Sequence, residues 1–305
     1  MLKEVKDYEI KALKKQIFIS NLKAWIIGII LIAEILFIII YLLNMELFDD
    51  VSSAKTKVAV IRYNKPVTEK FTTAVMEKMD KIRKDKSYKS VLFIMGSPGG
   101  SPTASEELSE YLKDYQKDKN ITMYIDSMAA SGGYYIASAI KPLYANKNAI
   151  VGSIGVIMPH YNFGKLAKKI GVEEDYVTAG KFKKPISMLA KIDDENRKYI
   201  TKHLLKPTYE NFIKSVASNR GVSIKKLRPF TEGKIFIANV PEIKGILVDK
   251  ISSLYKIKKM IRKSLNDKDI DFINIKLEEK PLFVPQIKLN IPLSYDFTIK
   301  NKMNL

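Results

Sequence analysis

The stretch DSMAASGGYYIA, residues 126–137, places a serine between an expected strand and an expected helix. The apolar run at residues 121–125 predicts a short buried strand, and the residues after the serine are apolar with helical spacing. A serine at such a turn is held toward solvent, beside the free amides of a helix N-terminus. The small residues around Ser131 let backbone and substrate approach closely, so that the amide of Gly132 can point at a developing oxyanion.

A second glycine turn, SPGG at residues 97–100, follows another hydrophobic run at residues 91–95. Because the carboxyl ends of neighbouring parallel strands meet at one edge of a sheet, the two turns can face each other across one site. A glycine-rich turn with a capping serine is the simpler interpretation of either turn alone. Together they resemble the signal peptide peptidase A family, peptidase family S49, whose members are serine proteases with a Clp/crotonase-type fold.

The patterns around these turns alternate between strand and helix. Residues 58–61 predict a further strand, residues 66–86 have helical spacing, and Thr103 with Glu106 suggests a capping box at the start of another helix. This alternation predicts an α/β protein with a mostly parallel sheet flanked by helices. The resemblance implies that this sheet is a Clp/crotonase-like core.

We place the protease domain at residues 58–265. The last segment, residues 266–305, alternates apolar and polar residues and contains three prolines. It is expected to be a C-terminal extension, either an edge hairpin or an arm that reaches a neighbouring subunit. Between residues 193 and 220 the pattern predicts a long helix that Pro207 kinks or splits.

The beginning of the chain predicts a membrane anchor. Residues 1–23 are polar and carry six lysines, residues 24–44 are almost wholly apolar, and residues 45–57 form a polar linker. The 19 residues from Trp25 to Leu43 span roughly 28 Å as a helix, close to the thickness of a bilayer's hydrocarbon core. A cleaved signal peptide is the alternative, but the preceding polar region is long and no small-residue cleavage pattern follows the run.

The charges around the span predict its orientation. Lysines precede it and acidic residues follow it, so the positive-inside rule places the N-terminus in the cytoplasm. We therefore expect a single-pass protein of a bacterial cytoplasmic (inner) membrane, with the catalytic domain on the extracytoplasmic side.

The formal net charge of +19 raises the question of nucleic-acid binding. Only six of the 52 basic residues are arginines, whereas base readout and bidentate phosphate contacts favour arginine. We expect no nucleic-acid partner, and attraction to anionic lipid instead. The chain has no cysteine and only two histidines, so it has no disulfides, and we expect neither a metal nor a cofactor.

The resemblance implies a lysine as general base. In the family this group lies in a Gly-x-aromatic-Lys element, which Gly180, Phe182 and Lys183 match. A free lysine has a pKa of about 10.4, and burial among apolar groups lowers such a value by several units. A neutral amine can then accept the serine proton as Oγ attacks a peptide carbonyl. The neighbours Lys181 and Lys184 are expected to be solvated and not catalytic.

The resemblance also assigns supporting roles. Ser153, in the stretch GSIGVI at residues 152–157, matches the residue that hydrogen-bonds and orients the lysine amine. Gly100, Gly99 and the amide of Gly132 match the oxyanion hole, a set of backbone donors for the oxygen that becomes negatively charged.

His160 is the rival general base. It would need to lie within hydrogen-bond reach of Ser131 and to be oriented by a carboxylate, and the sequence offers no recognisable carboxylate partner. Two other functions also fit the fold: a crotonase-like acyl-thioester enzyme, and a catalytically inactive membrane scaffold.

The sequence as a whole favours a membrane-anchored serine endopeptidase with a Ser–Lys dyad. Its expected substrates are cleaved signal peptides and other apolar, membrane-associated peptides. A single protease domain is about half of what tandem members of the family carry, so we expect a homo-oligomeric ring.

Overall fold

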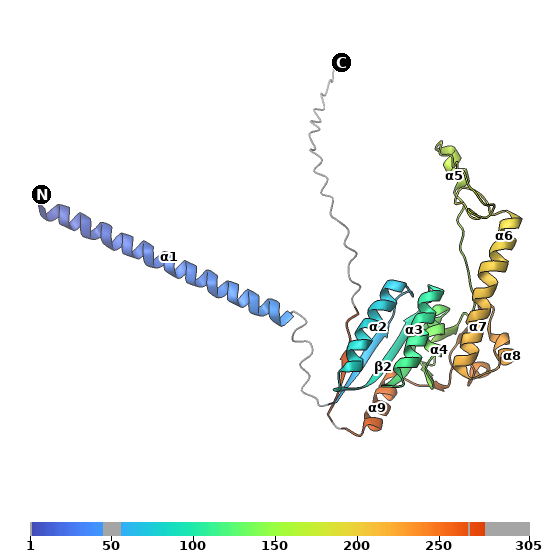
Figure 1. Cartoon of the computed structure of the whole chain (residues 1–305). Coiled ribbons are helices and arrows are strands. Elements are labelled where there is room, and N and C mark those ends of the chain that lie inside the picture. The colour runs from blue at the N-terminus through green and yellow to red at the C-terminus, as the bar shows by residue number, and fades with distance from the viewer. Residues whose placement is uncertain (1, 45–55, 268, 278–305) are drawn as a thin grey trace, which may run out of the picture.

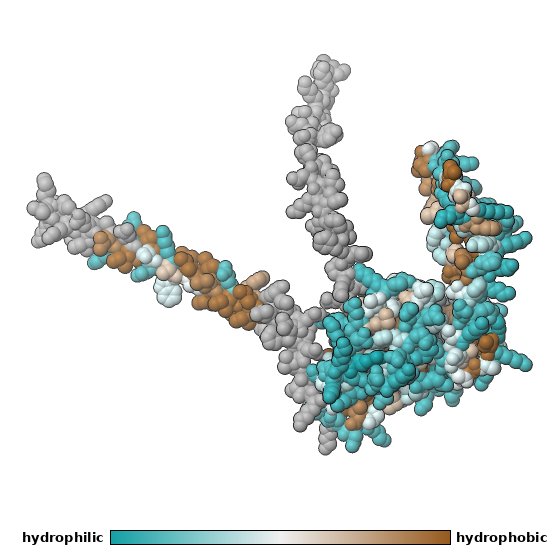
Figure 2. Space-filling view, in the orientation of Figure 1, coloured by the Kyte–Doolittle hydropathy of each residue, from teal (hydrophilic) through white to brown (hydrophobic). Residues whose placement is uncertain are grey.

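The computed structural model describes residues 2–44, 56–267 and 269–277 (Figure 1). The first range is one helix, α1 (Leu2–Asn44). Its stretch Leu13–Ile40 is long and apolar enough to cross a membrane, and none of its described side chains is buried. Figure 2 shows hydrophobic atoms along this part of the helix. The stretch begins before the span expected at residues 24–44, because apolar residues are interspersed with the preceding lysines.

The rest of the described chain forms one eight-stranded sheet with helices on both faces. Its main path runs in the order β6-β5-β3-β2-β1-β8, while β4 pairs with β3 and β7 pairs with β4. The named strands all pair in parallel except β5 with β6, so the expected mostly parallel α/β sheet is confirmed. The strands are β1 (Thr56–Tyr63), β2 (Tyr88–Ser97), β3 (Asn120–Ala130), β4 (Leu143–Ala145), β5 (Ile150–Gly152), β6 (Ile235–Ile237), β7 (Lys250–Ile251) and β8 (Ile270–Asn274).

The central strands are buried on both faces, as their continuous apolar runs predict. In β1, Ala59 and Ile61 belong to the larger core cluster, whereas Val58 and Val60 belong to the smaller one on the opposite face. The larger cluster includes side chains of five helices: α2 (Glu69–Lys84), α3 (Pro102–Tyr115), α4 (Gly132–Ser138), α7 (Lys206–Arg220) and α8 (Ile224–Leu227). The smaller cluster includes side chains of α9 (Leu254–Leu265). Burial on both sides fixes the strand ends that carry the two glycine turns.

The sheet continues beyond the domain boundary expected at residue 265. Strand β8 (Ile270–Asn274) lies at the sheet edge and pairs with β1 in parallel. Within the described residues, this part of the expected extension is thus an edge strand that pairs in parallel with the first strand of the domain. The remainder of the expected extension, residues 278–305, lies outside the described residues.

The start of α3 differs from the expected capping box. Ser101 is the N-cap, and its hydroxyl accepts a hydrogen bond of 3.3 Å from the amide of Ala104. Pro102 occupies the first helical position, where its fixed φ and missing amide are favourable. A cap at Thr103 is therefore wrong by two residues.

An arm, residues 157–200, leaves the sheet between β5 and the long helical region. It contains α5 (Gly164–Lys169) and α6 (Asp194–Ile200), and Figure 1 shows α5 far from the sheet. After α6 come a π-helical turn, η1 (Thr201–Leu205), and α7 (Lys206–Arg220). The expected break at Pro207 is confirmed, because the irregular turn directly precedes the helix whose second residue is this proline.

Candidate active site

Ser131 lies at the point where β3 ends and α4 begins. Its backbone has φ 50° and ψ −125°, a positive φ that is uncommon for a residue other than glycine. The Ser131 amide donates to the carbonyl of Gly152 at 3.0 Å, and its own carbonyl accepts from the amides of Tyr134 and Tyr135. The half-buried hydroxyl has no hydrogen-bond partner in the described part of the chain. Strain of this kind is concentrated at functional sites, and here it presents a free hydroxyl.

The two glycine turns meet at this serine, as the sequence predicts. A Cβ on Gly99 would lie 2.7 Å from the Cβ of Ser131 and 2.8 Å from the amide nitrogen of Gly132. A Cβ on Gly132 would lie 3.3 Å from the amide nitrogen of Gly100. Only glycine permits so close an approach of the two backbones.

The amides at this meeting point are not equivalent. Gly99 donates to the hydroxyl of Ser97 at 3.2 Å. The amides of Gly100 and Gly132 donate to no other residue of the described chain. Two unengaged amides therefore lie beside the free hydroxyl of Ser131, and the part of Gly99 is to allow their approach.

A cavity of about 300 Å³ opens beside Ser131. Tyr135 and Phe212, whose rings stack at 5.0 Å, form an apolar wall together with Val156 and Ile157. Among the residues that line the cavity, only Glu106 is charged. The cavity can therefore receive an apolar side chain of a bound chain.

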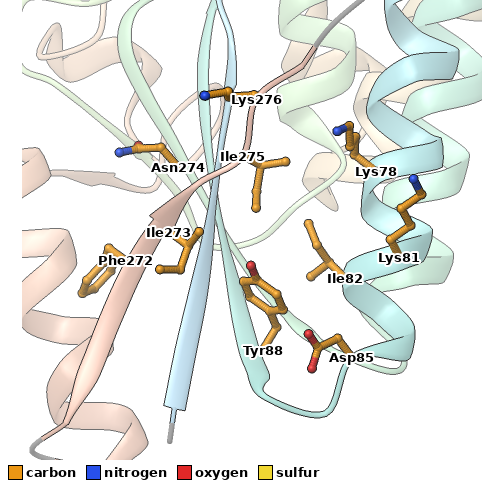
Figure 3. Close-up of a pocket in the computed structure, with 10 residues that line it drawn as sticks. All are labelled: Lys78, Lys81, Ile82, Asp85, Tyr88, Phe272, Ile273, Asn274, Ile275 and Lys276. Atoms are coloured by element: carbon orange, nitrogen blue, oxygen red, sulfur yellow. The ribbon is translucent and has the colours of Figure 1, made fainter. Parts of the chain in front are cut away.

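The phenol of Tyr135 stays neutral in this wall. Burial raises its pKa, the hydrogen bond to Ser215 at 2.8 Å lowers it, and the charges of Glu106 and Glu110 raise it. The net pKa lies above the usual range for tyrosine. A larger cavity, about 520 Å³, lies between α2 and β8 (Figure 3), and none of its lining residues belongs to the predicted site.

Ser153 follows β5 as Ser131 follows β3. These strands pair with Ala130 opposite Gly152, so the two serines lie at adjacent strand ends. Ser153 also has a positive φ, 53°, and its amide donates to the carbonyl of Lys234 at 2.7 Å. Its hydroxyl has no partner in the part of the chain that the structure describes. The structure thus brings Ser153 to the same edge of the sheet as Ser131.

Lys183 is not brought to this cavity. It lies in a turn of the arm, where its amide donates to the carbonyl of Gly180 at 3.1 Å. Its side chain is exposed, has no ion pair or hydrogen bond within the described residues, and does not line the Ser131 cavity. A single chain therefore presents the predicted nucleophile and the predicted base at separate places.

The residues next to Lys183 are held by partners of their own. The Phe182 ring stacks on Tyr199 of α6 at 4.4 Å. Lys181 pairs with Glu195, and Lys184 pairs with Glu174, each at 2.5 Å. These contacts fix the turn, so that the middle lysine alone projects without a partner.

Neither histidine occupies the position of a general base. His160 donates from Nε2 to the carbonyl of Ser187 at 2.8 Å, and within the described residues it contacts neither Ser131 nor a carboxylate. His203 lies in the exposed π-helical turn, with its ring 5.1 Å from that of Tyr199.

A buried ion pair behind α4 was not anticipated from the sequence. The Arg220 side chain is fully buried, pairs with Asp249 at 2.7 Å and donates from Nε to the carbonyl of Ile246. Burial alone would raise the pKa of Asp249, but hydrogen bonds from Arg220 and from the amide of Leu143 outweigh it and lower that pKa. The neighbouring Tyr134 of α4 donates to the carbonyl of Leu247 at 2.9 Å. This cluster fixes the helix whose first turn presents Ser131.

Known proteins resemble this chain in sequence. The family model described as peptidase family S49 matches residues 113–268, about half of the chain. A putative protease of Methanocaldococcus jannaschii is 31% identical over 280 residues, which cover 88% of this chain and 89% of that protein. The chain belongs to peptidase family S49.

Other S49-like relatives carry protease names. A putative signal peptide peptidase SppA of Enterococcus faecium is 30% identical over 61% of this chain and 56% of its own. A probable protease SohB of Haemophilus influenzae is 30% identical over 54% of this chain and 47% of its own. This S49 chain is therefore a serine-type peptidase with the Clp/crotonase-like fold. The match to the family model includes Ser131, Ser153 and Lys183.

Alanine at Gly99 is expected to disable this S49 site. The new Cβ would press against Ser131 and the Gly132 amide, and a displacement of about 1 Å at a catalytic group can cost roughly a hundredfold in rate. Gly245→Ala is the matched control, because Gly245 also has a positive φ, 71°, but no atom within 4 Å of the added Cβ. Peptide cleavage and thermal unfolding should be measured for both variants. Equal activity of the two would contradict the close packing of the glycine turns.

Proposed function

We propose that this chain is a membrane-anchored endopeptidase in which Ser131 is the nucleophile and Lys183 the general base. The observation that carries the proposal is the free hydroxyl of Ser131 beside the unengaged amides of Gly100 and Gly132. Donors aimed at the place where negative charge develops are the largest single contribution to many acyl transfers. The match of Gly180, Phe182 and Lys183 to the family's lysine element supports the choice of base.

The reaction proceeds in two steps, acylation of Ser131 and hydrolysis of the acyl-enzyme. Ser131 Oγ bonds to the peptide carbonyl carbon while its proton passes to the lysine amine, and the carbonyl oxygen becomes an anion held by the two glycine amides. Collapse of this intermediate breaks the C–N bond, and the leaving amine takes the proton from the lysine. Water then attacks the acyl-enzyme in the same way and releases the new carboxyl end. Ser153, at the adjacent strand end, orients the amine.

The base has to reach the nucleophile from outside its cavity. An exposed ammonium is protonated at neutral pH, so a lysine that serves as base has to be enclosed by apolar groups. The arm exposes ten large hydrophobic side chains: Ile157, Met158, Tyr161, Phe163, Leu166, Ile170, Val172, Tyr176, Val177 and Met188. Figure 2 shows hydrophobic atoms along this arm. Monomers rarely expose so much apolar surface, so a second copy of the chain is its natural partner.

We infer that the chain assembles as a homo-oligomeric ring in which each arm packs on the next subunit. In a ring built from one head-to-tail contact, Lys183 of one subunit meets Ser131 of its neighbour. Packing of the arms would enclose the lysine and would exclude water from the site. A ring also leaves a shared chamber that admits extended peptides and excludes folded proteins.

The substrates are apolar peptides, above all signal peptides left in the membrane after secretion. The apolar wall of the Ser131 cavity suits a hydrophobic side chain, and α1 would hold the enzyme at the bilayer where such peptides remain. The printed name of the Enterococcus faecium relative, a putative signal peptide peptidase, is consistent with this choice.

Labelling with a fluorophosphonate tests the serine chemistry. The detergent-solubilised full chain is expected to form one adduct, at Ser131, because only an activated serine displaces fluoride. Ser131→Ala should lose the adduct. Ser127→Ala should keep it, because the exposed Ser127 hydroxyl donates to Asp126 and lies before the turn. An acyl-thioester enzyme or an inactive scaffold would give no adduct in the unmodified chain.

Proteolysis from outside the cell tests the membrane topology. Residues beyond about 50 should be extracytoplasmic, because lysines precede the apolar span and acidic residues follow it. Protease added to spheroplasts should digest the sheet domain and spare the first twenty or so residues. Digestion of the N-terminal segment with protection of the domain would reverse the orientation and remove spent signal peptides as accessible substrates.

A further inference from the structure

Helix α9 (Leu254–Leu265) is far more cationic than the other helices of the sheet domain. Its twelve residues include five basic and no acidic side chains: Lys256, Lys258, Lys259, Arg262 and Lys263. By contrast, α3 carries four acidic residues and one lysine, and α2 balances five basic residues with three acidic ones. The charge on α9 is therefore not explained by the lysine-rich composition of the chain.

The faces of α9 have separate roles. Ile257 and Ile261 are buried against the sheet. Lys258 and Arg262 lie over the ring of Phe272, at 5.0 Å and 4.9 Å from its centre. These four residues, through their contacts with the sheet and with Phe272, hold α9 in place.

The outward face presents free lysines around an aromatic residue. Lys256, Lys259 and Lys263 are exposed, and their side chains make no hydrogen bond, ion pair or ring contact with any described residue. Tyr255, 75% exposed, lies on the same face because residues four apart are neighbours on a helix. Lysines beside an aromatic ring are typical of segments that contact the membrane–water interface.

This face lies at the end of the domain where the anchor joins the sheet. Thr56, the first described residue after the linker, donates from Oγ1 to Asp267 at 2.5 Å, two residues beyond the end of α9. Figure 1 shows α9 at the same end of the sheet domain as the start of β1. Only eleven residues, 45–55, separate α1 from Thr56, a reach of at most about 40 Å.

Further charges surround this end. Lys86 and Lys89 are exposed beside the start of β2, whose Tyr88 pairs in register with Lys57 of β1. The acidic groups here include Asp85, whose side chain accepts from the amide of Ser87, and Asp267 and Asp269, which follow α9. Asp271 of β8, which pairs in register with Lys57, also lies at this end. We name as the amino pole the outward face of α9 together with Lys86 and Lys89.

We propose that the amino pole docks on anionic lipid headgroups of the bilayer that α1 enters. The proposal rests on the membrane anchoring proposed above. Clustered lysines near a membrane surface are attracted to anionic lipid, and a covalent anchor keeps them within reach of it. Lysine suits this partner, whereas nucleic-acid recognition favours arginine.

Docking would fix how the active site faces the membrane. The strands run away from the amino pole, and Ser131 follows the far end of β3, roughly 33 Å from its start. The Ser131 cavity would then open away from the lipid, so a substrate peptide has to leave the bilayer before it is cleaved.

A single cysteine reports this contact, because the chain has none of its own. Tyr255→Cys would carry an environment-sensitive fluorophore in the full chain, reconstituted in vesicles of phosphatidylcholine alone or with about a third phosphatidylglycerol. With the anionic lipid, we expect quenching by aqueous acrylamide to fall at least about twofold. Salt at about 1 M should restore the quenching, because the electrostatic screening length shrinks to about 3 Å. The same label at Ile170→Cys, on the arm, should not respond.

Two matched triple variants test the lysines. Lys256→Gln, Lys259→Gln and Lys263→Gln together should remove the response of the label at residue 255. Lys165→Gln, Lys168→Gln and Lys169→Gln on α5 remove the same charge from the arm and should leave the response intact. If the label at residue 255 lost its response equally in both triple variants, the response would depend on the total charge of the chain, and the proposal would be overturned.

The remaining outcomes separate docking from anchoring. A chain that floats with vesicles at high salt, but whose label is quenched equally in both lipids, would overturn docking and leave the anchor standing. A chain that fails to float would overturn the anchor and docking with it. A label that responds to duplex DNA and not to phosphatidylglycerol would assign the pole to nucleic acid. Peptide cleavage in detergent tests the proposed peptidase separately, because no bilayer is present.

Discussion

Replacing Ser131 with alanine is expected to lower peptide cleavage by at least about a thousandfold. The hydroxyl supplies the attacking oxygen. Ser105 also lies beside Gly132, but its hydroxyl donates to the carbonyl of Ser101 at 2.7 Å and is not expected to replace it. The fold should persist, because the hydroxyl makes no hydrogen bond within the described residues and its loss leaves no partner unsatisfied. The rate is measured with an apolar fluorogenic peptide, and the fold by thermal unfolding of the same sample.

Ser127→Ala is the control for this experiment. Ser127 is exposed, lies four residues before the turn and is expected to tolerate the change with little loss of rate. Cleavage by Ser131→Ala at a near wild-type rate would end the serine-peptidase mechanism for this site, and a loss of folding in that variant would show that the strained turn needs its hydroxyl.

Replacing Lys183 with methionine should lower turnover by a similar factor, about a thousandfold. Methionine keeps an apolar stem of similar length but cannot accept a proton. Lys183→Arg should fail as well, because guanidinium does not lose its proton in the working range.

The neighbouring residues supply the controls. Lys181→Ala and Lys184→Ala each remove an ion pair of the arm, and exposed pairs of this kind contribute little to stability. Both variants should keep most activity, as should His160→Ala, whose ring contacts the carbonyl of Ser187. All five variants are compared with one peptide from neutral to alkaline pH. An inactive His160→Ala beside an active Lys183→Met would transfer the base role to the histidine.

The nucleophile's surroundings could be predicted because they depend on short sequence patterns. Each glycine turn follows a buried apolar run, and parallel strands put such turns at one edge of the sheet. The positive φ of Ser131 and the approach of Gly99 to it follow from this geometry. The sequence did not reveal which amides were free, because the bond from Gly99 to Ser97 depends on a side-chain rotamer.

The position of the base could not be predicted, because the motif around Lys183 describes only a local turn. Where the turn lies depends on the path of the arm, which the hydrophobic pattern does not determine. The pairing of Arg220 with Asp249 was missed for a related reason, since it joins residues far apart in sequence.

The errors in predicting where helices and strands begin, and which strands pair, have simpler causes. Thr103 and Glu106 have the spacing of a capping box, but Pro102 begins the helix one residue earlier and leaves Ser101 as the cap. Strand β8 lies in the segment interpreted as a C-terminal extension, because the alternating pattern does not show that these residues pair with β1. Local patterns identify such elements, whereas their boundaries and partners depend on tertiary contacts.

The central claim is that Ser131 of one subunit and Lys183 of another form each active site. Ser131→Ala and Lys183→Met chains with different affinity tags would be co-expressed, and assemblies holding both chains isolated through the two tags. With random mixing, half of the serine positions and half of the lysine positions are intact, so about a quarter of the junctions carry a complete pair. The account predicts that the mixed assemblies recover roughly this fraction of wild-type cleavage, although each parent variant is inactive. Mixed assemblies that hold both chains and remain inactive would contradict it.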